Sequence, residues 1–392
     1  RFDPAEPESF ELSNGVTVFF LRDRALPVLD LFIDLRGGYV YFDREHYAAG
    51  SALPSMMRNA GTRSFPPDSV DELIEFNALG VSTSSDGARI MLTMNGLARQ
   101  MDLIVTLWSE MLLAPRFDRE VVERWRLREI ESVRRISDFP GSLAVLEFNH
   151  LMYGDHPTGW IMKEDDLGPG KLSTDRLRML HSRIICPERA VIGAAGDVDR
   201  DELRAALERA FAGWEPCGTP LVAPAAPELR PDRSIYVIPK SLSQSTIIVG
   251  QPGGVLLTES EDYFASRVAN WVIGGSGFTS RLVNRLRTQE GLAYSAASIW
   301  GAAREHPLVV ADGLGGFIFP RFHPSFDGLF AVDANGVPSV AEWVHLQGPS
   351  ALAQAAGFRF SNPIRSRRLV VEAGKERRRR RRDSGASALP GL

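Results

Sequence analysis

A proline-dense segment near the middle of the chain separates two stretches that begin in the same way. Residues 215–233 carry few large apolar side chains, a composition typical of a linker between domains. Its prolines are Pro216, Pro220, Pro224, Pro227 and Pro231. The chain's 392 residues also exceed what one hydrophobic core organises, which is roughly 250–300. On each side of the linker the patterns predict two strands and then a helix, so we expect an α+β protein. It would consist of two homologous half-domains, each an antiparallel sheet covered by helices.

This division places the N-terminal half-domain at residues 1–225 and the start of the C-terminal half-domain at residues 226–302. Residues 303–392 are rich in Gly, Ala, Pro and Arg, and their periodicity fades. Six consecutive arginines at 377–382 fit an arm for nucleic acid or an anionic surface, but a disordered tail is the favoured interpretation. The tail has either diverged or departs from the true reading frame near residue 303.

The first half contains several clear element signals. Residues 10–36 predict two strands, which we expect to be adjacent and antiparallel. Residues 46–60 predict a helix that Pro54 should bend or restart. A long, heavily charged helix is predicted over residues 118–137, with Asp118 as its N-cap.

Composition excludes several classes of protein. Lys and Arg total 45 against 49 for Asp and Glu, and 44% of residues are hydrophobic, which excludes a dedicated polyanion binder and a wholly disordered chain. No run approaches the roughly 20 apolar residues of a membrane-spanning helix. Cys186 and Cys217 cannot form a disulfide framework, and no Cys/His cluster predicts a structural zinc site, so redox chemistry is not expected. The chain begins at Arg1 without a charged-then-apolar leader, so any signal peptide would already have been removed.

Motif searches for familiar active sites return little. The sequence contains no His-Glu-x-x-His, no His-x-x-Glu-His and no pair of histidines four residues apart. His156, which precedes Pro157, is expected to be a loop residue rather than a ligand. Residues 274–277 are glycine-rich, but no Lys-Ser/Thr follows them, so they predict a turn between helices rather than a phosphate cradle.

One constellation in the second half carries a family resemblance. The glycine-rich turn is followed by Ser280-Arg281-Leu282, and Arg287 precedes Gly291-Leu292-Ala293-Tyr294-Ser295. This order resembles the C-terminal half-domain of pitrilysin/insulinase-type zinc peptidases. The resemblance covers roughly residues 8–302 through short pieces in the same order, among them residues 12–16, 37–38, 60–62, 83–86, 117–118, 153–157, 187–189 and 196–198. It implies the LuxS/MPP-like metallopeptidase fold.

The chain departs from the family at the zinc site. An active member carries His-x-x-Glu-His on a helix shortly before Gly-Thr, where two histidines bind zinc and the Glu is the general base. Residues 52–58, before Gly61-Thr62, contain neither His nor Glu. Glu129 falls where the family's distal zinc-ligand Glu is expected, and without partners we interpret it as a helix-surface residue. The resemblance therefore implies no metal in this chain and no peptide hydrolysis by the chain alone.

The chain does keep Arg287, with Tyr294 seven residues later. In the family this pair comes from the half opposite the zinc and is thought to bind the substrate backbone and stabilise the developing oxyanion. The resemblance thus implies catalytic and substrate-binding roles for Arg287 and Tyr294. The alternative is an exposed helix-end Arg and a strand Tyr packed in the sheet. Arg285 and Arg281 are the neighbouring candidates, and a structural role is expected for Arg281.

Together these features imply the zinc-lacking subunit of a heterodimeric metallopeptidase that cleaves unfolded peptides. Its partner would be a His-x-x-Glu-His homologue that supplies the zinc; no cofactor in this chain, no nucleic-acid partner and no membrane span are expected. The alternative is a non-enzymatic scaffold or docking subunit of the same fold, as in respiratory-complex core proteins. Bacterial members of this kind are often exported, so a periplasmic or exported location is expected, with the cytoplasm as the alternative.

Overall fold

The computed structural model of the chain describes two compact units. The described residues are 5–222, 224–225, 235–242, 245–251 and 260–300, with the backbone of five short strands at residues 315–319, 331–332, 338–339, 359–360 and 369–372. One unit comprises Arg1–Asp138 with Asp155–Ala225, and the other comprises Phe139–Gly154 with Ala226–Leu392. Most of the predicted tail, including its arginine run, lies outside the described residues.

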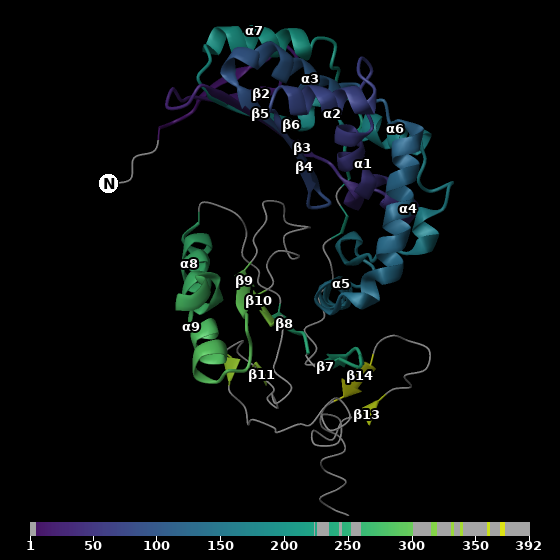
Figure 1. Ribbon diagram of the computed structural model, residues 1–392, viewed down its shortest axis with the longest axis vertical. Helices are drawn as coiled ribbons and strands as arrows, with labels where there is room; N and C mark the ends of the chain where they lie inside the picture. Colours follow the sequence, from purple (N-terminus) through teal and green to yellow (C-terminus); the bar gives the residue numbers. More distant parts are fainter. Residues whose placement is uncertain are drawn as a thin grey trace, which may run out of the picture. The chain divides into compact units, whose positions relative to one another are not determined.

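A six-stranded sheet forms the centre of the first unit (Figure 1). Its strands in chain order are β1 (Glu8–Glu11), β2 (Thr17–Arg22), β3 (Val28–Arg36), β4 (Gly80–Ser85), β5 (Arg89–Leu97) and β6 (Ala190–Gly196). Their order in the sheet is β1-β2-β6-β3-β5-β4. All neighbouring pairs are antiparallel except β2 and β6, which are parallel. The α+β class is therefore confirmed, with one parallel pair in a sheet that was expected to be antiparallel throughout.

The prediction that the two strands of residues 10–36 are neighbours was wrong, because β6 lies between β2 and β3. Five of the seven residues of this central strand are glycine or alanine. Gly193 faces Phe19 on β2 and Phe32 on β3, and a Cβ on Gly193 would sit 2.0 Å from the Phe32 ring. The small strand therefore lets large side chains of its neighbours lie across it. No local pattern in residues 10–36 reveals a strand that arrives from residue 190.

Helices cover one face of this sheet. They are α1 (Tyr47–Asn59), α2 (Pro67–Phe76), α3 (Met101–Leu113), α4 (Arg119–Arg135), α6 (Thr174–Ile184) and α7 (Arg200–Ala210). Side chains alternate along β3, so that Leu29, Leu31 and Ile33 are buried in the core beneath the helices. Trp108 of α3 is fully buried and donates a hydrogen bond to the carbonyl of Leu92 on β5 (3.2 Å).

Two sequence predictions about these helices have different outcomes. Asp118 is the N-cap of α4, as predicted, and its side chain accepts a hydrogen bond from the backbone N–H of Glu120. Pro54 was expected to bend or restart the helix over residues 46–60, whereas α1 is assigned as one helix from Tyr47 to Asn59 with Pro54 inside it.

The second unit contains helix α5 (Pro140–Tyr153), which we had placed in the first half-domain. Its further elements are β7 (Ile235–Val237), β8 (Ile247–Gln251), α8 (Glu261–Asn270), α9 (Arg281–Val283), β9 (Ala297–Trp300) and β10 (Gly315–Phe319). A three-stranded antiparallel sheet has the order β8-β10-β9, and a second one has the order β13-β14-β7, where β13 is Arg359–Phe360 and β14 is Leu369–Glu372. Beyond these, β11 (Ala331–Val332) pairs with β12 (Pro338–Ser339). Among the described helices of the chain, none is both long enough and apolar enough to cross a membrane.

Candidate functional site

Arg287, for which the resemblance implies a catalytic role, lies on a stretch of π-helix in the second unit. Ser280 caps α9 by accepting a hydrogen bond from the backbone N–H of Val283 (3.3 Å), and the chain continues as a π-helix over Asn284–Gln289. Leu286 on this turn is fully buried and anchors it in a small core, against which Val249 of β8 packs. Single-turn π-helices are rare and are found frequently at functional sites. Arg287 therefore extends from an anchored but irregular turn.

The structure brings Tyr294 back to Arg287. Gly291 adopts a φ of 65°, a left-handed conformation that glycine tolerates and other residues rarely adopt. The backbone N–H of Leu292 then bonds to the carbonyl of Leu286 (2.8 Å), which closes the turn. The Arg287 guanidinium carbon lies 4.4 Å from the centre of the Tyr294 ring, within cation–π range. Tyr294 precedes β9 and is 75% exposed, so it is not the packed strand residue of the alternative interpretation.

A second aromatic ring, which the sequence had not singled out, also contacts Arg287. The guanidinium carbon lies 4.5 Å from the centre of the Phe278 ring, and Phe278 is 73% exposed. Phe278 follows Gly277, whose φ is 63°. The only sequence signal for this contact is a glycine that precedes an aromatic residue in the turn. That signal does not by itself predict that the ring contacts Arg287.

The neighbouring arginines differ from Arg287 in their partners. Arg285 forms an ion pair with Glu290 (2.7 Å) and donates a hydrogen bond to Gln289 (3.0 Å). Arg281 was expected to have a structural role, but it is exposed and has no hydrogen bond or ion pair within the described part of the chain. Arg287 likewise has no carboxylate partner among the residues described. Among the described residues, the contacts of the Arg287 guanidinium are therefore with aromatic faces and not with a carboxylate.

The helix that precedes Gly61-Thr62 does not fit a zinc ion. Along α1, Ala52, Leu53 and Met56 are fully buried in the hydrophobic core of the first unit. None of these side chains offers the nitrogen, thiolate or carboxylate that zinc requires. The donor set of a zinc peptidase is therefore replaced by apolar packing.

Glu129, at the position of the family's distal zinc ligand, is half-buried on α4 rather than a simple surface residue. Burial raises the pKa of its carboxyl group above the usual value. The start of α1 nearby is filled by an aromatic cluster, in which Arg44 lies over the rings of Tyr47 (4.8 Å) and Trp160 (5.2 Å) and pairs with Asp166. Ionisation of Glu129 in this half-buried position therefore carries a desolvation cost.

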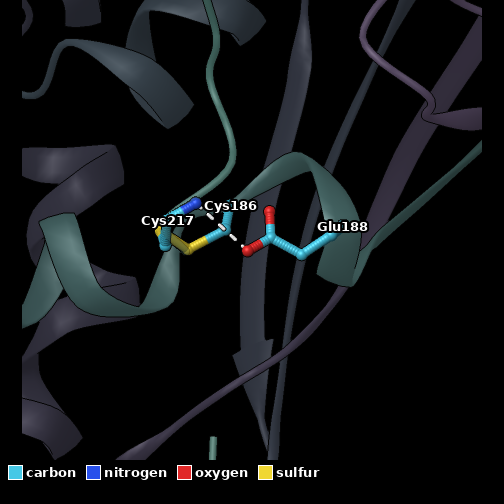
Figure 2. A group of neighbouring side chains, drawn as sticks. All are labelled: Cys186, Glu188 and Cys217. Carbon is cyan, nitrogen blue, oxygen red and sulfur yellow. Dashed lines mark hydrogen bonds between the residues drawn. A yellow bond between two sulfur atoms is a disulfide. The ribbon is translucent and has the colours of Figure 1, made fainter. Parts of the chain in front are cut away.

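Cys186 and Cys217 form a disulfide, which the sequence analysis did not foresee (Figure 2). They are 31 residues apart, and their Cα atoms are separated by 5.5 Å. Glu188 lies beside them and accepts a hydrogen bond from the backbone N–H of Cys217 (3.1 Å), so three potential ligand atoms lie within 4.8 Å of one another. Metal binding by cysteine requires thiolates, and in the disulfide the two sulfurs are bonded to each other. In this oxidised state the disulfide is a covalent cross-link, or staple, between Cys186 and Cys217.

The staple belongs to a set of contacts that fixes the start of the linker on the first unit. The buried Trp214 donates its indole N–H to the carbonyl of Ile185 (3.1 Å). Arg189 donates hydrogen bonds to the carbonyls of Arg183 and Thr219. These contacts therefore hold the chain on the first unit at least as far as residue 219, several residues beyond the end of α7.

A cavity of about 620 Å³ lies in the first unit, at the starts of α4 and α6. Arginines and carboxylates line it together, and they pair with one another: Arg116 lies 3.8 Å from Asp118, and Arg178 lies 3.3 Å from Asp175. Four of its charged lining residues are thus engaged with one another.

Comparison with known proteins gives one family match and several relatives. Residues 171–308 match the family described as the peptidase M16 inactive domain. An uncharacterized zinc protease of Streptomyces coelicolor is 30% identical over 207 residues, which cover 52% of this chain and 44% of that protein. The non-peptidase homolog YmxG of Helicobacter pylori is 24% identical over 281 residues, which cover 71% of this chain and 64% of that protein. The chain thus matches about half to two thirds of the length of these relatives.

Solved structures show the same fold. A peptidase M16 inactive domain from Pseudomonas fluorescens superposes with a TM-score of 0.68 at 20% identity, covering 82% of this chain and 76% of that chain. Pitrilysin superposes with a TM-score of 0.63 at 13% identity, covering 81% of this chain and 34% of that chain. At these identities the likeness concerns architecture alone.

Proposed function

The chain belongs to the pitrilysin/insulinase-type (M16) peptidase family, and from this we propose that it is the zinc-lacking subunit of a heterodimeric metallopeptidase. In this role it contributes Arg287 and Tyr294 to the zinc site of a partner and cleaves nothing alone. The description of the matched domain as inactive, and the name of the Helicobacter relative, support a non-catalytic subunit.

The observation that carries the proposal is the state of Arg287. It is an arginine without a carboxylate partner among the described residues, placed against the exposed ring of Tyr294. A guanidinium offers a planar fork of N–H donors to a peptide carbonyl, and a phenol offers one directed O–H donor to a tetrahedral oxygen. Donors fixed in advance at the place where negative charge develops lower the barrier of acyl transfer.

The partner supplies what this chain lacks. A His-x-x-Glu-His homologue would hold zinc and the general base, while α1 of this chain presents buried apolar side chains at the corresponding place. An unfolded peptide would add a strand to a sheet edge of the partner, so that backbone pairing gives broad sequence tolerance.

The test uses the purified chain with and without a His-x-x-Glu-His homologue from the same genome. We expect no stoichiometric zinc in the chain alone, and cleavage of an unfolded peptide by the mixture above that of the homologue alone. Zinc-dependent cleavage by this chain alone would contradict the proposal. So would a mixture no more active than the homologue by itself.

A scaffold or docking role is the second candidate. The buried apolar side chains of α1 support this role as much as they support the zinc-lacking subunit. A scaffold has no use for an accessible guanidinium beside a phenol. The two candidates therefore differ in what substitution of Arg287 does to turnover.

We also propose that the chain matures in an oxidising compartment, the periplasm or the outside of the cell. The Cys186–Cys217 disulfide supports this, because cytosolic reductants keep most protein thiols reduced. Cells are quenched with acid, and their protein is denatured and treated with a maleimide polymer; neither cysteine should be labelled before reduction, and both should be labelled afterwards. Labelling of both cysteines without reduction would contradict an oxidising location.

A further inference from the structure

We propose that Phe278 is a positioning residue for Arg287, holding its guanidinium between two aromatic rings so that the N–H edge faces the substrate. This inference rests on the proposed function. The guanidinium carbon lies 4.5 Å from the Phe278 ring centre and 4.4 Å from that of Tyr294. Both rings therefore contact the same guanidinium group.

The backbone that carries Phe278 is firmly held. Ser280 is fully buried, and its N–H (3.0 Å) and hydroxyl (2.7 Å) both donate to the carbonyl of Gly277. Thr279 donates its hydroxyl to the side chain of Ser276 (3.1 Å). This short turn, Gly277–Thr279, thus fixes the backbone position from which the Phe278 ring extends.

Core packing does not account for Phe278. Its side chain is 73% exposed, and it is absent from both hydrophobic clusters of the described chain. An exposed phenylalanine gains little from burial, so its removal should leave the stability of the unit nearly unchanged. Its contact with Arg287 is what a substitution would remove.

Restraint of Arg287 has a direct consequence for binding. A free arginine side chain samples many rotamers, and it loses that freedom when it binds a carbonyl. Contacts with two rings restrict the guanidinium before the peptide arrives, so less freedom is lost on binding. In the proposed arrangement the rings restrain the guanidinium, and its N–H donors remain for the peptide.

The functional test compares Phe278→Ala, Phe278→Leu and Phe278→Trp in the reconstituted complex. Loss of one exposed cation–π contact should lower kcat/KM about two- to fivefold for the Ala and Leu variants, and Trp should restore it. Phe264→Ala is the matched control, since Phe264 is an exposed phenylalanine of α8 that contacts Tyr263 rather than Arg287. In an Arg287→Ala background, Phe278→Ala should have no further effect. Wild-type kcat/KM for both Ala and Leu variants in an active complex would overturn the inference.

A second measurement needs no activity. In the full chain alone, the Arg287 Nε–H resonance should be shifted by the ring currents of its two neighbours. Phe278→Ala should move this resonance and Phe278→Trp should keep it displaced, with an unchanged melting temperature. If no mixture ever cleaves peptide, the proposed function fails. The Arg287 resonance still tests whether Phe278 holds the guanidinium, because that measurement needs no activity. An Arg287 resonance unaffected by Phe278→Ala would overturn the inference that Phe278 positions Arg287.

Discussion

At the scale of single residues, two turns of the backbone bring Tyr294 and Phe278 to Arg287. The closeness of Tyr294 to Arg287 depends on Gly291, whose left-handed backbone returns the chain after the π-helix, and a glycine in that place is visible in the sequence. Phe278 reaches Arg287 through a turn fixed by Ser280 hydrogen bonds, which no periodicity reveals. The roles of these residues in catalysis remain predictions.

At Tyr294 a substitution can remove a single hydrogen-bond donor and little else. Tyr294→Phe removes one O–H donor and keeps the ring against Arg287. Loss of a single oxyanion donor should lower kcat of the reconstituted complex about 10²-fold, with a smaller change in KM. Steady-state kinetics on an unfolded peptide measure this, with Tyr263→Phe of α8 as the control. Equal kcat for wild type and Tyr294→Phe would exclude an oxyanion role for the phenol.

Glu129 predicts a pH dependence of stability. Burial raises its pKa in the folded chain above the usual 4.5, so the folded chain holds this proton more tightly than the unfolded chain. The contribution of Glu129 to stability is therefore most favourable at low pH and is lost as pH rises through the folded pKa. Glu129→Gln should raise the free energy of unfolding at pH 7 by less than about 1 kcal/mol and change it less at pH 4.

Thermal melting between these pH values tests the sign. The gap between Glu129→Gln and wild type should widen as pH rises. Glu131→Gln, an exposed position on the same helix, is the control and should show no such trend. Parallel melting curves for Glu129→Gln and wild type would show that burial does not affect this carboxylate.

At the scale of elements, helices were predicted more faithfully than strand neighbours. The helix predicted over residues 118–137 forms as α4 over Arg119–Arg135, and Asp118 caps it as predicted. Helical periodicity is local, so one window of sequence contains it. The place of β6 between β2 and β3 depends on a strand about 170 residues away in the chain, and local patterns carry no such information.

The disulfide was missed for the same reason, since its cysteines meet only through the folded loops before β6 and after α7. Opening a staple that closes 31 residues should lower the free energy of unfolding of the first unit by about 3 kcal/mol. Urea unfolding followed by tryptophan fluorescence, with and without dithiothreitol, measures this.

The control is a chain with both Cys186→Ser and Cys217→Ser. It should unfold at the lower urea concentration of the reduced wild type and show no response to dithiothreitol. A reductant effect of equal size in the control would mean that the staple does not account for the stability difference.

At the scale of the whole molecule, the sequence indicated two α+β units and a break near residue 225, and the compact units part at Ala225. Helix α5 groups with the second unit although it precedes the linker, because chain order does not determine which core a helix joins. The absence of a zinc motif was readable from residues 52–58, and the structure adds that apolar core packing takes its place. Under the proposed function, a subunit with this pattern depends on its partner for chemistry.

The most direct test of this dependence is the turnover of the reconstituted complex with Arg287→Ala beside Arg285→Ala. Arg285 is the matched control because it lies on the same π-helix but is paired with Glu290. With both complexes shown to assemble, Arg287→Ala should lower kcat about 10²- to 10³-fold, and Arg285→Ala should leave it close to wild type. Wild-type turnover for Arg287→Ala in an assembled complex would contradict the account and leave the chain as a scaffold.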